Sequence, residues 1–245
     1  MKSQIGNVIA VIPAFNEEAF IDEIISKTKS FVDLVLVCDD GSTDNTSKMI
    51  RKNDAIILRN PKKMGKGYSL KCLFKEAEKY NPQMIITLDG DGQHDPNDIP
   101  KLITPILSNE YDLVVGSRFV YGSFTDISYI RNFGLQIINL LHNILLKYPH
   151  SDSQCGFRAF GRKAIDIMIK CNENGYGIET EQLILAMKYG LRMTEVPVTV
   201  RYRGLNNTSK MNSVKHACII TKFVLYNFLR DMKASNVMAR EKYRI

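Results

Sequence analysis

The chain has 245 residues, of which 44% are apolar and 24% charged, a composition typical of a globular protein and unlike that of a disordered one. Lysine and arginine exceed aspartate and glutamate by seven, which favours anionic partners such as phosphates, nucleic acid or an acidic membrane surface without choosing among them. Five cysteines without C-x-x-C spacing suggest neither a disulfide framework nor a zinc site. We see no signal peptide, and no apolar stretch reaches the ~20 residues that a spanning helix needs, so we expect a cytoplasmic protein whose membrane contact is peripheral.

Short β-rich runs alternate with helical patterns in the first half of the chain. Strands are predicted at the following apolar runs: Val8–Ile12, Leu34–Cys38, Ala55–Leu58, Met84–Leu88 and Leu113–Gly116. Helices are predicted from Ile21, over Asp44–Arg51, over Gly65–Tyr80 and between Ile99 and Leu107, where Pro100 and Pro105 oppose a helix. This alternation predicts an α/β fold with a mostly parallel central sheet and helices on both faces.

The second half of the chain is less regular. Its patterns predict a long helix over Ile130–Leu145, a short strand over Cys155–Phe160, a helix over Glu179–Tyr189, a strand over Thr194–Tyr202, a polar loop over Arg203–Asn212 and a helix from Val214 to about Lys233. Because the sequence contains no internal repeat, linker or low-complexity segment, we expect a single domain over residues 1–245.

Polar clusters follow four of the predicted strands directly. They are Pro13–Glu18, Asp39–Thr43, Asp89–Gln93 and Ser117–Arg118. Open parallel sheets bind ligands at the carboxyl ends of their strands. The sequence therefore predicts an active-site cleft at this edge of the sheet.

Asp89 directly follows the apolar run 85–88, and one residue separates it from Asp91. Both carboxylates can therefore reach one hard cation. Mg²⁺ and Mn²⁺ prefer oxygen ligands and often share them with a substrate's phosphates. Gly90 would let the backbone approach a ligand closely, and Gln93 could add an amide oxygen. The alternative is a polar turn in which Asp95 caps the next helix.

Two further segments have both a binding and a structural interpretation. Asp39 and Asp40 could accept hydrogen bonds from a base or a ribose, or they could belong to an Asx-type turn. The loop 60–67 is basic and enters a helix, where backbone amides and Lys66 could hold phosphate, although it is neither a P-loop nor a dinucleotide-binding loop. Lys62 and Lys63 could equally be solvated.

Several basic side chains lie in polar surroundings of the second half. They are Arg118, Arg131, Arg158, Arg201, Arg203 and Lys210. Clustered arginines bind phosphate in a bidentate manner, whereas most single arginines on a protein surface contact solvent.

Taken in order, these motifs resemble those of family 2 glycosyltransferases, which have the GT-A fold. The matching segments are residues 12–18 (IPAFNEE), 39–44 (DDGSTD), 65–67 (GKG), 89–94 (DGDGQH) and 116–118 (GSR). Within that family, residues 152–158 (DSQCGFR), 195–198 (EVPV) and 209–210 (SK) resemble segments of dolichyl-phosphate mannose and glucose synthases.

The resemblance implies roles for individual residues. The nucleotide-sugar donor would contact Pro13, Phe15, Glu17, Asp39, Asp40, Lys66, Gly90, Arg203 and Lys210, the last two from a loop over the donor. Asp89, Asp91 and Gln93 would hold Mg²⁺ or Mn²⁺ on the diphosphate, and Arg118 and Arg131 would face the acceptor phosphate. Leu135 stands where the family would place a small polar residue. Residues 1–92 would form the nucleotide-sugar half, 93–212 the acceptor half, and 213–245 an amphipathic helix and tail.

The predicted activity is a metal-dependent, inverting transfer of a sugar to dolichyl or another polyprenyl phosphate. The sequence does not distinguish GDP-mannose, UDP-glucose and UDP-N-acetylglucosamine as donors, and it leaves the oligomeric state open. One alternative is transfer to a saccharide hydroxyl, which needs a base such as Glu179 or Glu181. A nucleic-acid-binding module is a distant alternative, because no RNA-binding or helix-turn-helix signature is present.

The predicted C-terminal helix has an apolar stripe from Val214 to Met232, flanked by Lys215, Lys222 and Lys233. Such a pattern suits a helix that lies on anionic lipid, at the cytoplasmic face of a membrane. The alternative is that the stripe packs on the core of this domain.

Overall fold

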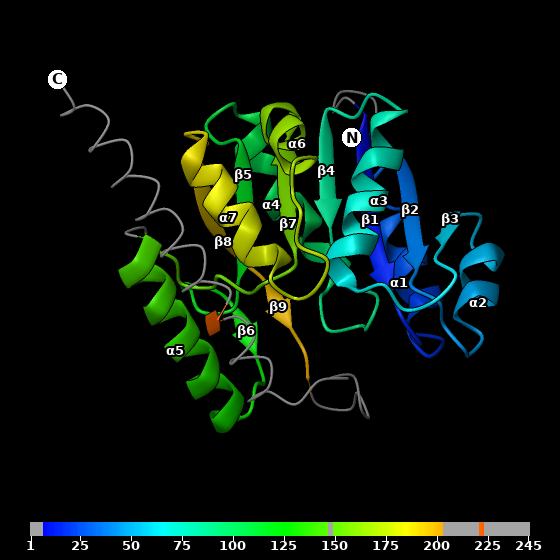
Figure 1. Ribbon diagram of the computed structural model, residues 1–245, viewed down its shortest axis with the longest axis horizontal. Coiled ribbons are helices and arrows are strands. Elements are labelled where there is room, and N and C mark those ends of the chain that lie inside the picture. The colour runs from blue at the N-terminus through cyan, green and yellow to red at the C-terminus, as the bar shows by residue number, and fades with distance from the viewer. Residues whose placement is uncertain (1–6, 147–148, 203–220, 223–245) are drawn as a thin grey trace, which may run out of the picture.

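The computed structural model describes residues 7–146, 149–202 and 221–222. A seven-stranded sheet forms its centre (Figure 1). The strand order is β3 (Ile56–Arg59), β2 (Leu34–Asp39), β1 (Val8–Ala14), β4 (Met84–Thr87), β7 (Arg158–Gly161), β5 (Leu113–Ser117) and β8 (Met193–Pro197). Every pair is parallel except those of β7, which runs antiparallel to both β4 and β5. The predicted mostly parallel sheet is therefore confirmed.

Helices cover both faces of this sheet. On the face toward the viewer in Figure 1, α3 (Lys66–Glu78) packs on β1 and β2, and α6 (Arg162–Met168) packs on β7 beside α7 (Ile178–Lys188). On the other face, α4 (Ile99–Leu107) packs on β5, β7 and β8, and α1 (Ile21–Thr28) contacts α2 (Thr46–Lys52) and the short 3₁₀ helix η1 (Pro96–Asp98). Because both faces are covered, the central strands are buried along their length and mostly apolar, with polar residues such as Thr87, Ser117 and Arg158 at strand ends.

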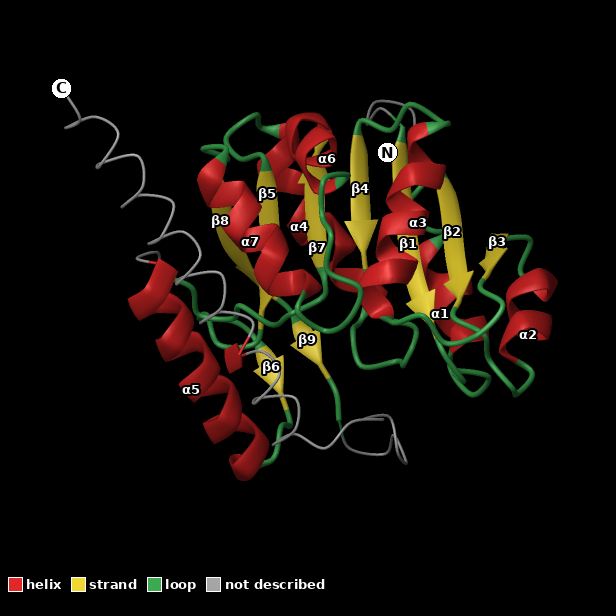
Figure 2. Cartoon of the chain, in the orientation of Figure 1, coloured by secondary structure: helices red, strands yellow, loops and turns green. Residues whose placement is uncertain are grey.

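A smaller unit lies outside these layers. It consists of α5 (Tyr129–Leu146) and a parallel pair of short strands, β6 (Phe124–Thr125) and β9 (Thr199–Val200), as Figure 2 shows. The inner face of α5 is fixed both by the buried apolar side chains of Leu135 and Ile138 and by polar contacts. The Asn139 amide oxygen accepts hydrogen bonds from Ser153, and His142 Nε2 lies 3.0 Å from the Thr180 hydroxyl. This unit borders the same edge of the sheet as the polar strand ends.

Two predicted strands differ from the structure, and one helix was not predicted. The strand expected over Cys155–Phe160 begins later, at Arg158, because the residues before it form part of the pocket wall. The strand expected over Thr194–Tyr202 divides at Val198 into β8 and β9, which belong to different sheets. Helix α6 was not predicted, because it spans only Arg162–Met168 and therefore offers two turns of pattern at most, although its buried residues have helical spacing. Helix α4 forms as the spacing predicts, with Pro100 in its first turn, where a backbone N–H is not required.

The predicted loop and helix after Tyr202, with Arg203, Lys210, Lys215 and Lys233, lie outside the described residues apart from Thr221 and Lys222, which are helical. No helix in the described part of the chain combines the length and the apolar character that a membrane crossing requires.

Candidate active site

A pocket of about 210 Å³ opens at the carboxyl ends of β1, β4 and β5. It is lined by these residues that the sequence had predicted for the site: Pro13, Phe15, Glu17, Asp40, Lys66, Asp89, Gly90, Asp91, Gln93, Arg118 and Arg131. The remaining predicted residues are Asp39, which does not line the pocket, and Arg203 and Lys210, which lie outside the described residues. The structure thus brings together motifs that are far apart in the sequence.

Asp39 and Asp40 differ in their surroundings although they are adjacent. Asp39 is fully buried, and its carboxylate accepts hydrogen bonds from the Ser42 amide at 2.8 Å and from the Ser47 hydroxyl. It therefore shapes the turn after β2, as the Asx-type alternative predicted, and its nucleoside contact stays a prediction. The Asp40 carboxylate borders the pocket and accepts hydrogen bonds from the amides of Met64 and Gly65, both at 2.8 Å. Asp40 thus ties the basic loop to the edge of the sheet.

Lys63 also lines the pocket, where its Nζ atom lies 4.1 Å from the centre of the Phe15 ring. A cation over an aromatic face is an attractive arrangement. The sequence did not separate Lys63 from Lys62, which does not line the pocket. Lys62 and Lys63 are the same residue type, so only the conformation of the loop shows which of them reaches the pocket.

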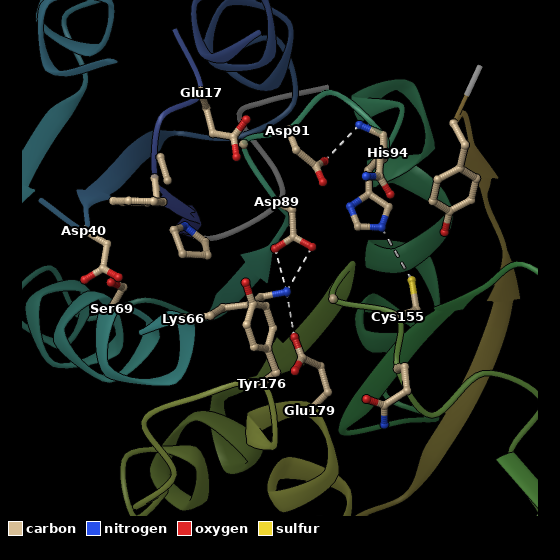
Figure 3. Close-up of a pocket in the computed structure, with 18 of the residues that line it drawn as sticks. Glu17, Asp40, Lys66, Ser69, Asp89, Asp91, His94, Cys155, Tyr176 and Glu179 are labelled. Atoms are coloured by element: carbon tan, nitrogen blue, oxygen red, sulfur yellow. Dashed lines mark hydrogen bonds and ion pairs between the residues drawn. The ribbon is translucent and has the colours of Figure 1, made fainter. Parts of the chain in front are cut away.

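Lys66 connects two carboxylates at the centre of the pocket (Figure 3). Its Nζ atom lies 2.7 and 2.9 Å from the two oxygens of Asp89 and 2.7 Å from Oε1 of Glu179. The sequence did not predict this pairing, and the phosphate contact that it predicted for Lys66 stays a prediction. Gly156 leaves the necessary room, because a Cβ atom there would lie 2.8 Å from Lys66 Nζ and 3.0 Å from Asp89 Oδ2.

Burial and neighbouring charges shift the pKa values of Lys66 and Asp89 in opposite directions. Burial alone would lower the pKa of Lys66, but Asp89 and Glu179 raise it above its ordinary value. Likewise burial would raise the pKa of Asp89, whereas the Lys66 ammonium lowers it. Burial and the neighbouring Asp89 together raise the pKa of Asp91 to about 7. A second positive charge near Asp91 would therefore stabilise the ionised site.

The two candidate bases named from the sequence occupy different places. Glu179 lines the pocket and is paired with Lys66. Glu181 instead accepts hydrogen bonds from the backbone amides of Asn172 and Glu173, and it does not line the pocket. His94 is neutral at pH 7, because burial lowers its pKa to about 4.

Arg118 and Arg131 line the side of the pocket next to α5. The guanidinium of Arg118 donates two 2.5 Å hydrogen bonds to Asp152, which is fully buried, and one of 2.7 Å to the hydroxyl of Tyr202. The guanidinium of Arg131 stands over the Tyr202 ring, 4.5 Å from its centre. Asp152 and Tyr202 were not predicted as partners of these arginines.

Arg158 and Arg201 do not line the pocket. Arg158 is fully buried and donates hydrogen bonds to the backbone carbonyls of Ser153, Cys155 and Glu179. It is therefore a structural residue that fixes the segment before β7.

The oxygen-bearing side chains that follow β4 are suited to bind a hard cation such as Mg²⁺ or Mn²⁺. Asp89, Asp91 and Gln93 all line the pocket and present oxygen ligands, and the pKa of Asp91 is raised by burial and by the negative charge of Asp89. Among the described residues, no group of three or more histidine, cysteine, aspartate or glutamate side chains is arranged to hold a metal ion. Oxygen atoms of a bound diphosphate commonly complete a Mg²⁺ site.

The sequence matches the family model of glycosyl transferase family 2 over residues 9–168. The chain therefore belongs to this family, and it is a glycosyltransferase.

Proteins from several organisms are similar to it. An uncharacterized protein of Methanocaldococcus jannaschii is 35% identical over 225 residues, which cover 89% of this chain and 91% of that protein. The UDP-N-acetylglucosamine–dolichyl-phosphate N-acetylglucosaminyltransferase of Methanococcus voltae is 30% identical over 218 residues, which cover 80% of this chain and 86% of that enzyme.

The predicted GT-A fold is confirmed by solved structures. Glucosyl-3-phosphoglycerate synthase from Mycobacterium tuberculosis, in complex with Mn²⁺, uridine diphosphate and phosphoglyceric acid, matches with a TM-score of 0.70 at 21% identity. The match covers 92% of this chain and 78% of that one.

Proposed function

We propose that this enzyme transfers a sugar from a nucleoside-diphosphate sugar to a polyprenyl phosphate such as dolichyl phosphate. The main observation in support of this proposal is the lining of the pocket. The guanidinium groups of Arg118 and Arg131, which could bind an acceptor phosphate, line the same pocket as the carboxylates of Asp89 and Asp91. The name of the M. voltae relative, which specifies dolichyl phosphate as acceptor, supports the same substrate class.

The donor would occupy the side of the pocket formed by β1 and the basic loop. Phe15 offers a flat apolar face to a base, and Asp40 and Lys63 border the same region. The diphosphate would then lie near Asp89 and Asp91. We propose that these two carboxylates, with Gln93, hold Mg²⁺ or Mn²⁺, which would neutralise charge that develops on the leaving diphosphate. Lys66 already lies against Asp89, so it would remain close to that diphosphate.

The acceptor would bind on the side of α5. A phosphate monoester is largely a dianion at neutral pH, since its second pKa is near ~6. Its oxygen can attack the anomeric carbon directly, and the bond from that carbon to the diphosphate oxygen breaks as the new bond forms. Attack from the side opposite the leaving group inverts the configuration. This reaction requires no general base, in agreement with the pairing of Glu179 with Lys66.

A lipid acceptor also requires access to a membrane surface, and we propose peripheral association at the cytoplasmic face. Helix α5 contributes Arg131 to the pocket and exposes apolar side chains on its outer side. These are Tyr129, Ile130, Phe133, Ile137, Leu140 and Ile144. Apolar side chains next to the acceptor subsite are what contact with a bilayer would require.

A transfer assay tests the proposal. Purified enzyme would be given GDP-mannose, UDP-glucose or UDP-N-acetylglucosamine, each with dolichyl phosphate, with dolichol, or with an oligosaccharide. We expect transfer from one donor to dolichyl phosphate, no transfer to dolichol, and loss of transfer in Asp91→Asn. Transfer to the oligosaccharide in preference to the lipid phosphate would favour the alternative of a hydroxyl acceptor.

A further inference from the structure

Tyr202 lies between the two arginines of the acceptor side. Its hydroxyl oxygen accepts a 2.7 Å hydrogen bond from Nη1 of Arg118. The face of its ring lies 4.5 Å from the guanidinium carbon of Arg131. The three residues come from separate parts of the fold, since Arg118 follows β5, Arg131 belongs to α5, and Tyr202 follows β9. Tyr202 therefore joins the smaller unit to the main sheet at the pocket.

The fold fixes the position of the Tyr202 ring. Its backbone amide donates a 2.5 Å hydrogen bond to Asp126, and its side chain packs against the main apolar core. On the other side, Arg118 is held by Asp152, whose backbone amide donates to Glu195 at 2.9 Å. Both ends of the Arg118–Tyr202 contact are thus anchored independently.

The contacts of Arg118 with other described residues use only some of its N–H donors. A guanidinium has five N–H groups. Arg118 uses one on Nε and one on Nη2 for Asp152, and one on Nη1 for Tyr202. Within the described part of the chain the other two N–H groups, one on each terminal nitrogen, have no hydrogen-bond partner, and Arg118 lines the pocket. The like charges of the Arg118 and Arg131 guanidinium groups repel each other. The Tyr202 hydroxyl oxygen beside Arg118 and the face of the Tyr202 ring beside Arg131 offset that repulsion.

We infer that Tyr202 is a positioning residue for the phosphate of the acceptor, because it holds Arg118 and Arg131 where both can donate to one phosphate group. This inference rests on the proposed function, in which these arginines bind the acceptor. Tyr202 acts through the arginines and does not take part in bond making. Its two contacts have different chemical origins, so they can be removed one at a time.

Two substitutions separate the contacts. Tyr202→Phe keeps the ring beneath Arg131 and removes the oxygen that Arg118 reaches, whereas Tyr202→Leu removes both. Isothermal titration with a short, soluble prenyl phosphate, in the absence of donor, measures acceptor binding without turnover. We expect Tyr202→Phe to weaken this binding roughly tenfold and Tyr202→Leu roughly fiftyfold, from the lower end of the typical strength of a charge-assisted hydrogen bond and the typical strength of a cation–π contact. The matching prenol, which lacks phosphate, should not bind measurably to any of the proteins.

Steady-state kinetics provide the second readout. Both variants should raise KM for the prenyl phosphate and leave kcat and the KM for donor within about twofold, since the donor side is unchanged. Tyr121→Leu is the matched control, because Tyr121 is fully exposed and should leave every constant unchanged. Tyr202→Phe preserves the packing of the ring, so it tests the inference even if Tyr202→Leu folds poorly.

The outcomes distinguish the inference from the proposed function. If wild type transfers sugar to prenyl phosphate but both Tyr202 variants bind that acceptor as wild type does, the inference is wrong and the function stands. If the variants raise donor and acceptor KM equally, Tyr202 is merely structural and the inference is also wrong. If wild type neither binds nor glycosylates a prenyl phosphate, both proposals fail together.

Discussion

Replacing Lys66 with methionine should destabilise the metal-free protein and at the same time strengthen its binding of Mn²⁺. The substitution keeps the length of the side chain and removes the ammonium. Asp89 and Glu179 then lose the cation that lies within 2.9 Å of their oxygens. Removing one partner of a buried ion pair leaves an uncompensated charge.

The expected loss of stability in Lys66→Met depends on how deeply the carboxylates of Asp89 and Glu179 are buried. Breaking a buried pair in this way typically costs about 3–5 kcal/mol. The side chain of Glu179 is only 6% exposed, but that of Asp89 is 26% exposed and borders the pocket, where water reaches it. We therefore expect the lower end, a fall of about 3 kcal/mol in the free energy of unfolding. A divalent cation no longer has to displace the ammonium from Asp89. If its affinity rises tenfold, saturating Mn²⁺ restores about 1.4 kcal/mol more to the variant than to wild type.

Urea denaturation at increasing Mn²⁺ concentration, without nucleotide, measures both effects. Lys62→Met is the control, because Lys62 is exposed on the same loop and does not line the pocket, so its stability should change by less than about 0.5 kcal/mol. The reasoning is refuted if Lys66→Met is as stable as Lys62→Met, or if Mn²⁺ stabilises the variant no more than wild type.

Two other predictions concern a glycine and a buried histidine. Gly156→Ala should reduce transfer at least roughly tenfold and should lower stability by less than Lys66→Met does, because the new methyl would lie 2.8 Å from Lys66 Nζ and would move the ammonium away from Asp89 without removing it from the pocket. Kinetics and a melting curve check this, and wild-type kinetics would contradict it. Burial lowers the pKa of His142 to about 4, so its contribution to stability is complete above pH 6.5 and is lost as the pH falls from 6.5 toward 4. His142→Gln should flatten the difference in unfolding free energy between pH 4.5 and 7, by up to about 3 kcal/mol, and an unchanged difference would disprove the assignment.

The sequence was sufficient for the parts of the fold that depend on local pattern. Apolar runs followed at once by polar residues predicted the strands and the edge at which Asp89 and Asp91 lie. The direction of β7 was not predictable in this way, because an apolar run has the same pattern in parallel and antiparallel strands. The division of the final strand at Val198 depends on which neighbour each half pairs with, and pairing is a long-range property.

The same limit applies to the site. The sequence indicated Lys66 and Arg118 as cations near phosphate, but it could not reveal what neutralises them. Their partners are Glu179 and Asp152, which reach them only through the packing of α7 and of the segment before β7. Tyr202 lies 84 residues from Arg118 in the chain, so no local spacing relates the two. Residue type predicts what a side chain can bind, whereas the fold determines what it does bind.

The central claim is that the acceptor atom belongs to a phosphate monoester on a prenol. Its most direct test is the structure of the product formed from the preferred donor and a short prenyl phosphate in the presence of Mn²⁺. We expect a phosphodiester between the prenol and the anomeric carbon, identified by mass spectrometry and phosphorus NMR, with the anomeric configuration opposite to that of the donor and no product in excess chelator. A product in which the sugar is attached to a hydroxyl oxygen, or with retained configuration, would contradict it.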